Sequence, residues 1–185
     1  ISWISLDGKK IEGVIYKPAN FDPNKKYPVI MHQYSGPGSQ EVLDEWRIGA
    51  RSDGGMFEAY MTNLGFIMVC VDGRGTGGRG AEFEKCTYMS IGVKEARDQV
   101  ETALYLGTLP YVDKDRIGVH GWSYGGFMTI SLITNYPDIF KVAVAGGPVI
   151  DWKWYEVMYG ERYMDNPAVN PEGYEKTSLI NKAAD

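Results

Sequence analysis

Apolar runs of strand length alternate along the chain with segments of helical periodicity. Residues 27–34 and 66–71 are short, nearly continuous apolar runs, the pattern of buried parallel strands. Residues 91–106 instead repeat apolar side chains at helical spacing, with one face formed by Val93, Ala96, Val100, Ala103 and Leu104. Further strands are predicted at 116–120 and 142–145, and further helices at 57–64 and 126–133. Strands that alternate with helices indicate an α/β fold with a largely parallel sheet.

The two ends of the chain differ from this alternation. Residues 1–7 and 10–17 predict two strands joined by a hairpin turn at Asp7-Gly8, which would form an antiparallel edge of the sheet. The chain starts at Ile1 rather than Met, and its last segment contains no strand that could close the sheet. We therefore expect residues 1–185 to be one incomplete domain from a larger protein.

Composition is that of an ordinary globular protein, with 44% apolar and 23% charged residues. The net charge of −5 argues against nucleic acid or an anionic membrane as a partner. No apolar stretch reaches the length of about 18 residues that a membrane-spanning helix needs. Cys70 and Cys86 form no metal-ligand pattern; Cys70 lies in an apolar run and is expected in the core, and a disulfide between the two stays open.

The sequence Gly121-Trp122-Ser123-Tyr124-Gly125 lies between a predicted strand and a predicted helix. A G-x-S-x-G sequence in this context is typical of a nucleophile elbow, a strained turn that projects a serine from the end of a sheet. Its small residues let the helix pack close to the strand. The helix N-terminus that follows presents free N–H groups and a partial positive charge, which suit a developing oxyanion.

The elbow lacks the base that a serine nucleophile requires. Both histidines of the chain, His32 and His120, precede Ser123 and fall in predicted strands, whereas the triad order on this fold is Ser, Asp or Glu, then His. We interpret both as packed or hydrogen-bonded strand residues. The carboxylates after Ser123 are interpreted as surface groups or local caps, and the base is expected from a downstream histidine outside this chain.

Several ordered motifs resemble one known family. They are Tyr34-Ser35-Gly36-Pro37-Gly38-Ser39-Gln40, Asp72-Gly73-Arg74-Gly75-Thr76-Gly77, Gly121-Trp122-Ser123-Tyr124-Gly125-Gly126, and Pro148-Val149 with the aromatic stretch up to Met164. With these motifs the chain resembles the catalytic domain of the prolyl oligopeptidase family of serine peptidases, most closely its dipeptidyl peptidase IV branch. The resemblance implies an α/β-hydrolase fold, a mostly parallel sheet with an antiparallel N-terminal hairpin, incomplete at the C-terminus. It also implies that a β-propeller domain and the triad Asp and His lie outside residues 1–185.

The resemblance assigns roles to particular residues. Ser123 would be the acylating nucleophile, and the Tyr34 hydroxyl and the Tyr124 backbone N–H would form the oxyanion hole. The S1 pocket would be walled, together with Tyr124, by Val149, Trp152, Tyr155 and Tyr159. A proline ring is compact and apolar, so flat aromatic walls suit it. The three aromatic residues of the wall are spaced three and four apart, so we expect them on one face of a helix, where burial in an ordinary core is the alternative.

The implied activity is serine peptidase cleavage after Pro or Ala, with release of N-terminal dipeptides by the full-length parent. The isolated chain is expected to be nearly inactive. A post-proline endopeptidase or an acylaminoacyl-type peptidase of the same family is the alternative. No cofactor or metal is expected, and the partner is a peptide with Pro or Ala at the penultimate position. Dimerisation of the parent stays open, as does its compartment among periplasmic, secreted and membrane-anchored.

Two alternatives come from other classes. Residues 75–80 fit G-x-G-x-x-G after a strand, with Glu95 and Asp98 downstream, as in a dinucleotide-binding oxidoreductase. Against this, residues 82–90 are expected to be irregular where the fingerprint should open a helix, and both acidic residues fall in a helix instead of ending a second strand. The other alternative is a non-catalytic homologue that keeps the fold, which the missing histidine permits.

Overall fold

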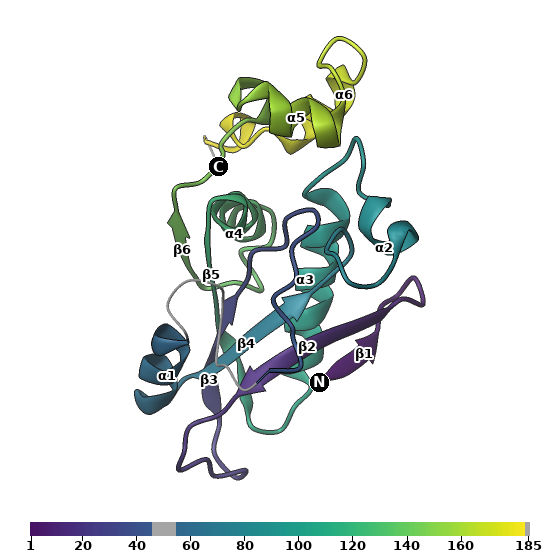
Figure 1. The fold of residues 1–185 in the computed structure, drawn as a ribbon. Coiled ribbons are helices and arrows are strands. Elements are labelled where there is room, and N and C mark those ends of the chain that lie inside the picture. The colour runs from purple at the N-terminus through teal and green to yellow at the C-terminus, as the bar shows by residue number, and fades with distance from the viewer. Residues whose placement is uncertain (46–54, 184–185) are drawn as a thin grey trace.

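The computed structural model describes residues 1–45 and 55–183, and it is built on one mixed sheet (Figure 1). The strand order is β1-β2-β4-β3-β5-β6. Strands β3, β4, β5 and β6 run parallel, while β1 and β2 form the antiparallel edge, with β2 antiparallel to β4. The strands are β1 (Ser2–Ile4), β2 (Lys10–Tyr16), β3 (Tyr27–His32), β4 (Ile67–Asp72), β5 (Val112–Trp122) and β6 (Val142–Gly146). The predicted α/β class, parallel core and N-terminal hairpin are therefore confirmed.

Helices connect the parallel strands and cover both faces of the sheet. They are α1 (Met56–Asn63), α2 (Ala81–Lys85), α3 (Val93–Gly107), α4 (Tyr124–Asn135), α5 (Val157–Met164) and α6 (Pro171–Thr177), with short 3₁₀ turns at Trp152–Trp154 and Ile180–Lys182. Figure 1 shows α5 and α6 gathered above α4, beyond the sheet. The chain therefore returns after β6 across the end of the elbow helix.

Strand alternation divides the sheet into two faces. Val29, Met31 and Val119 are buried among the core residues that α4 also supplies. The residues between them point the other way, where His32 and His120 meet Phe57 of α1. The side covered by α3 and α4 thus holds the main core, and the side of α1 is only partly covered.

Two sequence predictions about the helices are wrong. Residues 82–90 are not all irregular, because α2 begins at Ala81, directly after Gly80. On α3, Leu104 was placed on the apolar face but is 55% exposed, whereas the carboxylates of Glu95 and Asp98 are buried. The reason is that both carboxylates find partners on other elements. Asp98 accepts a hydrogen bond from Arg74 in the glycine-rich loop that follows β4, and Glu95 accepts one from the Tyr124 hydroxyl of α4.

The two cysteines lie apart from each other in the sheet and in the segment after α2. Cys70 is buried in β4, as predicted, and both cysteines carry free thiols. Burial raises the pKa of the Cys70 thiol well above its usual range. Across residues 1–45 and 55–183, no helix combines the length and apolar character needed to cross a membrane.

Candidate active site

Ser123 occupies a strained turn between β5 and α4. Its backbone has φ 59° and ψ −114°, a left-handed conformation that costs a non-glycine residue energy. The turn is held on both sides: the Ser123 N–H donates to the Gly146 carbonyl at 2.9 Å, and the Phe127 N–H donates to the Ser123 carbonyl at 3.0 Å. The predicted strand, strained serine and helix of a nucleophile elbow are therefore all present.

Close backbone packing explains the glycines around the serine. A Cβ atom on Gly121 or on Gly125 would lie 2.5 Å from the Gln33 carbonyl oxygen, and one on Gly126 would lie 2.5 Å from the Gly146 carbonyl oxygen. These obstacles are backbone atoms of strands β3 and β6 or their ends, which cannot swing aside. Only glycine lets α4 approach the sheet closely enough to form this turn.

An open cavity of about 330 Å³ adjoins Ser123. Val149, Asp151, Trp154 and Tyr155 are among the residues that line it. Among the described residues, no hydrogen-bond partner of the Ser123 hydroxyl is found. The first N–H groups of α4 also lack partners within their own helix. The geometry thus offers an accessible hydroxyl beside free backbone donors, at the rim of a partly apolar cavity.

Neither histidine of the chain approaches this cavity. His32 contacts the buried Glu58 carboxylate of α1, and His120 Nδ1 donates to the Val144 carbonyl at 2.8 Å. Their rings stack with centroids 4.9 Å apart, on the α1 side of the sheet. The prediction that both are strand histidines is confirmed, and the Ser123 hydroxyl has no base within the described part of the chain.

Tyr34 follows β3 and turns back towards the elbow. Ser35, the next residue, has φ 64°, and a Cβ on Gly36 would collide with the Tyr34 ring at 2.4 Å. The Tyr34 ring lies 5.9 Å from the Tyr124 ring. Burial raises the pKa of Tyr159, as does the nearby Tyr34 phenol, with which Tyr159 shares a hydrogen bond. Tyr34 therefore bridges the elbow and the aromatic segment that follows β6.

A buried polar network around the loop after β3 is not evident from the sequence. Gln33 Nε2 donates to the Gly125 carbonyl at 3.0 Å, and the Ser35 hydroxyl donates to Gln33 Oε1 at 2.8 Å. Gln99 of α3 donates to the Ser35 hydroxyl at 3.0 Å. These bonds tie the strained loop after β3 to the elbow. The one sequence feature that could have indicated this network is the set of polar residues on the side of α3 that is buried in the structure.

The aromatic residues predicted to form the pocket wall pack together, but not on a single helix. Trp152 lies in a 3₁₀ turn, Tyr155 is extended, and Tyr159 lies in α5, so the expectation of one shared helical face is wrong. The rings still meet: the Trp152 centroid is 5.5 Å from that of Tyr159 and 5.6 Å from that of Tyr155. Val149 and Trp152 are buried, while Tyr155 is 41% exposed at the cavity. Trp152 also packs against Tyr124 and Phe127, whose ring centroids lie within 5.3 Å of its own. These ring contacts, and not helical spacing, bring the aromatic residues together.

The side chain of Tyr124 reaches a buried carboxylate. Its hydroxyl donates to Glu95 Oε1 of α3 at 3.0 Å, and both residues are 1% exposed. Burial raises the pKa of Glu95 from its ordinary value of 4.5 to about 7. In the sequence, Glu95 fits only the acidic position of a dinucleotide fingerprint. Its true neighbour is the residue after the candidate nucleophile.

The glycine-rich loop is filled by the protein itself. A Cβ on Gly73 would lie 2.9 Å from Asp98 Cβ, and one on Gly75 would lie 3.1 Å from the Thr87 side chain. The backbone N–H of Arg74 donates to Asp98 Oδ2 at 2.6 Å, and the Arg74 guanidinium pairs with the same carboxylate. A pyrophosphate would meet buried carboxylates here instead of free N–H groups, which argues against dinucleotide binding.

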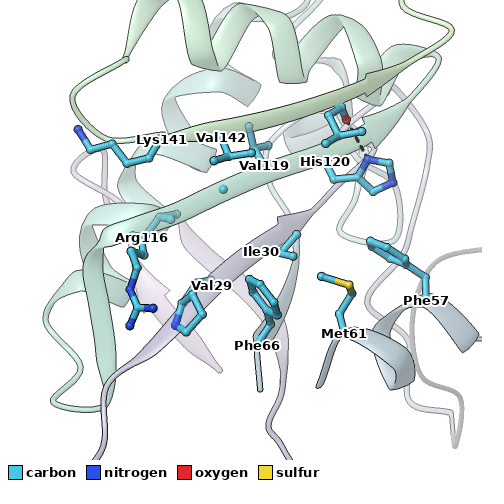
Figure 2. A pocket seen from close by; sticks show the side chains of 14 residues that line it. Val29, Ile30, Phe57, Met61, Phe66, Arg116, Val119, His120, Lys141 and Val142 are labelled. Atoms are coloured by element: carbon cyan, nitrogen blue, oxygen red, sulfur yellow. Dashed lines mark hydrogen bonds between the residues drawn. The ribbon is translucent and has the colours of Figure 1, made fainter. Parts of the chain in front are cut away.

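A larger cavity of about 580 Å³ lies away from Ser123, on the α1 side of the sheet (Figure 2). Phe57, Met61, Phe66 and Val142 point into it, and His120 stands at one end. The described residues that line it include no nucleophile paired with a base. Among the described residues, no group of three or more His, Cys, Asp or Glu side chains is placed to hold a metal ion.

Comparison with known proteins identifies relatives of the chain. Residues 56–185 match the prolyl oligopeptidase family. The chain is 45% identical to "Probable dipeptidyl-aminopeptidase B" of Arthroderma otae, over 97% of this chain and 19% of that protein. It superposes on a candidate dipeptidyl aminopeptidase IV from Bacteroides ovatus with a TM-score of 0.91 and 50% identity, covering 98% of this chain and 25% of that one. Dipeptidyl peptidase 4 of Porphyromonas gingivalis gives a TM-score of 0.90 and 43% identity, covering 100% of this chain and 25% of that one.

Proposed function

The chain belongs to the prolyl oligopeptidase family of serine peptidases, and we propose that the protein carrying it cleaves peptides after Pro or Ala, releasing N-terminal dipeptides. The chain spans about a fifth to a quarter of the relatives it matches, so the complete activity belongs to the longer protein. The observation that carries the proposal is Ser123 in an elbow at the rim of a cavity bordered by Val149 and Tyr155. The elbow supplies a nucleophile and the cavity a place for the side chain before the scissile bond.

In the proposed reaction Ser123 Oγ attacks the carbonyl carbon of the scissile peptide bond. A histidine outside residues 1–185 takes the hydroxyl proton and later gives it to the leaving amine, and an Asp orients that histidine. The tetrahedral oxyanion accepts hydrogen bonds from the Tyr34 hydroxyl and the Tyr124 backbone N–H. Water then attacks the acyl-enzyme with the same histidine as base, which frees Ser123 and the dipeptide acid. Donors preorganised for the oxyanion each lower the barrier by about 3 kcal/mol.

The proposed S1 pocket is the part of the cavity beside Val149 and Tyr155, supported from inside by Trp152 and Tyr159. A proline ring is compact and apolar, so flat aromatic surfaces suit it. Because the ring is already rigid, it also loses little entropy on binding. The pairing of Trp152 with Tyr159 at an interplanar angle of 16° gives such a surface a fixed orientation. A larger P1 side chain would have to displace these packed rings.

The test is hydrolysis of Gly-Pro p-nitroanilide by the full-length protein, beside its Ser123→Ala variant. We expect steady turnover by the wild type and a loss of about 10³-fold or more in kcat for the variant, because the covalent route is removed. Unchanged activity in the variant would reject Ser123 as the nucleophile. The isolated chain of residues 1–185 is expected to show almost no turnover, because it lacks the base.

Blocked substrates separate the specificities within the family. An N-terminally blocked Gly-Pro anilide should be a poor substrate if free dipeptides are released, since an exopeptidase recognises the substrate amine. Efficient cleavage of the blocked Gly-Pro compound would instead indicate an endopeptidase, and cleavage of acetyl-Ala anilide an acylaminoacyl-type enzyme. No cleavage of any of them by a folded protein would favour the non-catalytic homologue.

A further inference from the structure

Tyr124 takes part in two features of the site at once. As the residue after Ser123, it carries the backbone N–H proposed for the oxyanion hole. Its ring lies 5.3 Å from that of Trp152 and 5.9 Å from that of Tyr34, so it also supports the aromatic wall. Any group that fixes the Tyr124 side chain therefore acts on both the donor and the pocket.

The group that contacts the Tyr124 hydroxyl is Glu95. Its Oε1 accepts the phenol proton at 3.0 Å, and its Oε2 is buried without a hydrogen-bond partner in the described part of the chain. The carboxyl lies under the glycine-rich loop, where a Cβ on Gly75 would come within 3.3 Å of Oε1. Glu95 thus fills the space between that loop and the elbow.

A carboxylate is a costly choice for this position. An uncharged acceptor such as a glutamine amide could accept the same phenol hydrogen bond without the penalty of burying charge. Within residues 1–45 and 55–183, no arginine or lysine pairs with Glu95, whereas its neighbour Asp98 is neutralised by Arg74. A buried carboxyl group retained without an ion pair, next to a nucleophile elbow, is the arrangement expected of a group with a functional role.

We propose that Glu95 is a positioning residue: its carboxylate holds the Tyr124 phenol and thereby sets both the oxyanion N–H and the inner surface of the proline pocket. This inference rests on the proposed peptidase function. An ionised acceptor forms a shorter and stronger hydrogen bond with a phenol than a neutral one does, so the hold on Tyr124 tightens when Glu95 is ionised. Tyr124 itself stays neutral, because burial raises its pKa well above the usual range.

The ionisation of Glu95 falls in the physiological pH range. The titratable groups that face it are Tyr124 of α4, Asp98 of its own helix and Cys86 from the segment after α2. Tyr159 lies close enough to Tyr124 to raise the pKa of the Tyr124 phenol. Burial is the main cause of the raised pKa of Glu95, about 7. Hydrogen bonds from the backbone of Glu95 and Gly92 and from the Tyr124 hydroxyl lower this pKa, and the nearby Asp98 carboxylate raises it. The elbow is therefore expected to be held more firmly at pH 8 than at pH 6.

The test is a double-mutant cycle in the full-length protein with Glu95→Gln and Tyr124→Phe, measured on Gly-Pro p-nitroanilide. Glu101→Gln is the matched control, because Glu101 is a buried carboxylate of the same helix that contacts Leu6 and Arg97 instead. We expect Glu95→Gln to lower kcat about fivefold at pH 8 and clearly less at pH 6. The effect should disappear in the Tyr124→Phe background, and the control should match the wild type.

The ratio of wild-type to Glu95→Gln activity cancels the titration of the triad histidine, which both proteins share. A ratio that does not change with pH, or an equal effect of Glu95→Gln in both backgrounds, would overturn the inference. If the wild type does not hydrolyse the substrate, the proposed function fails, and hydrogen exchange of the amides in residues 121–127 still decides the inference. Faster exchange in Glu95→Gln than in Glu101→Gln supports it, and equal exchange overturns it.

Discussion

The elbow at residues 121–126 and the aromatic segment at residues 149–163 border the same cavity but are built in different ways. In the elbow, neighbouring residues determine the geometry, because three glycines allow backbone atoms to come closer than any side chain would permit. In the aromatic segment, a 3₁₀ turn, an extended residue and a helix bring Trp152, Tyr155 and Tyr159 together through ring contacts. The turn at Ser123 therefore tolerates no added atoms, while the aromatic segment depends on the elements packed against it.

A glycine-to-alanine substitution made in each region should distinguish the two, and in the elbow it should have the largest effect on stability and activity. Gly126→Ala places a Cβ 2.5 Å from the Gly146 carbonyl oxygen, and neither backbone can move without opening the elbow. We expect roughly 3–5 kcal/mol loss in the free energy of unfolding and loss of activity. Urea unfolding and anilide hydrolysis of the full-length protein measure the two effects.

Gly160→Ala is the matched change in the aromatic segment. Its Cβ would meet the Trp152 carbonyl at an ordinary 3.4 Å within helix α5, so we expect no loss and a gain of up to about 1 kcal/mol from helix propensity. Similar destabilisation by both alanines would contradict the distinction between the two regions.

Next in size is the loss of a single hydroxyl that belongs to neither region. Tyr34→Phe keeps the ring contact with Tyr124 but removes the proposed oxyanion donor, so kcat should fall about 10²–10³-fold with little change in KM. Tyr159→Phe removes the other end of the phenol pair but no donor to the oxyanion, and we expect a change of less than about fivefold. Equal losses in both variants would show that the hydrogen bond between the two phenols matters, and not a donor to the oxyanion.

Glu95 links the two regions through Tyr124, and its pKa predicts a pH-dependent stability. Because the pKa is raised from 4.5 to about 7 in the folded protein, the unfolded chain releases this proton first as pH rises. Its contribution is therefore fully present below pH 4.5 and is lost as pH rises through about 7. Glu95→Gln should be more stable than the wild type at pH 8, by at most about 3 kcal/mol, and closer to it at pH 5. Thermal melting of the two proteins at pH 5 and pH 8 measures this difference in stability. If the difference is the same at the two pH values, the pKa of Glu95 is not raised.

The smallest effect is expected at the exposed edge of the aromatic segment. Tyr155→Ala removes one side of the cavity and should raise KM for the proline substrate about tenfold, with kcat changed less. Met158→Ala is the control, because Met158 is 80% exposed on the same segment and does not line the cavity. If Tyr155→Ala lowers kcat instead and leaves KM unchanged, the residue acts on the reacting groups and not on the proline ring.

The sequence by itself determined the α/β class, the antiparallel N-terminal edge and the position and strain of Ser123. These features depend on local patterns: apolar runs of strand length, a hairpin turn at Asp7-Gly8, and glycines at fixed distances from a serine. Each pattern restricts the backbone of its own residues, so neighbouring positions carry enough information. That both histidines lie in strands could be predicted for the same reason, since each falls within a local strand pattern. The alternation of side chains along a strand then places each of them on one face of the sheet.

Only the tertiary structure decided which polar side chains are buried and how the pocket wall is assembled. Local sequence patterns do not indicate the partners of Glu95, Gln99 and Gln33, because Tyr124, Ser35 and Gly125 lie on other elements, far away in the sequence. The aromatic spacing of residues 152–159 suggested a single helix, but Trp152 lies in a 3₁₀ turn and packs against Tyr124 and Phe127. Contacts between distant segments decide such cases, because burial and pairing energies depend on where the chain brings the groups together.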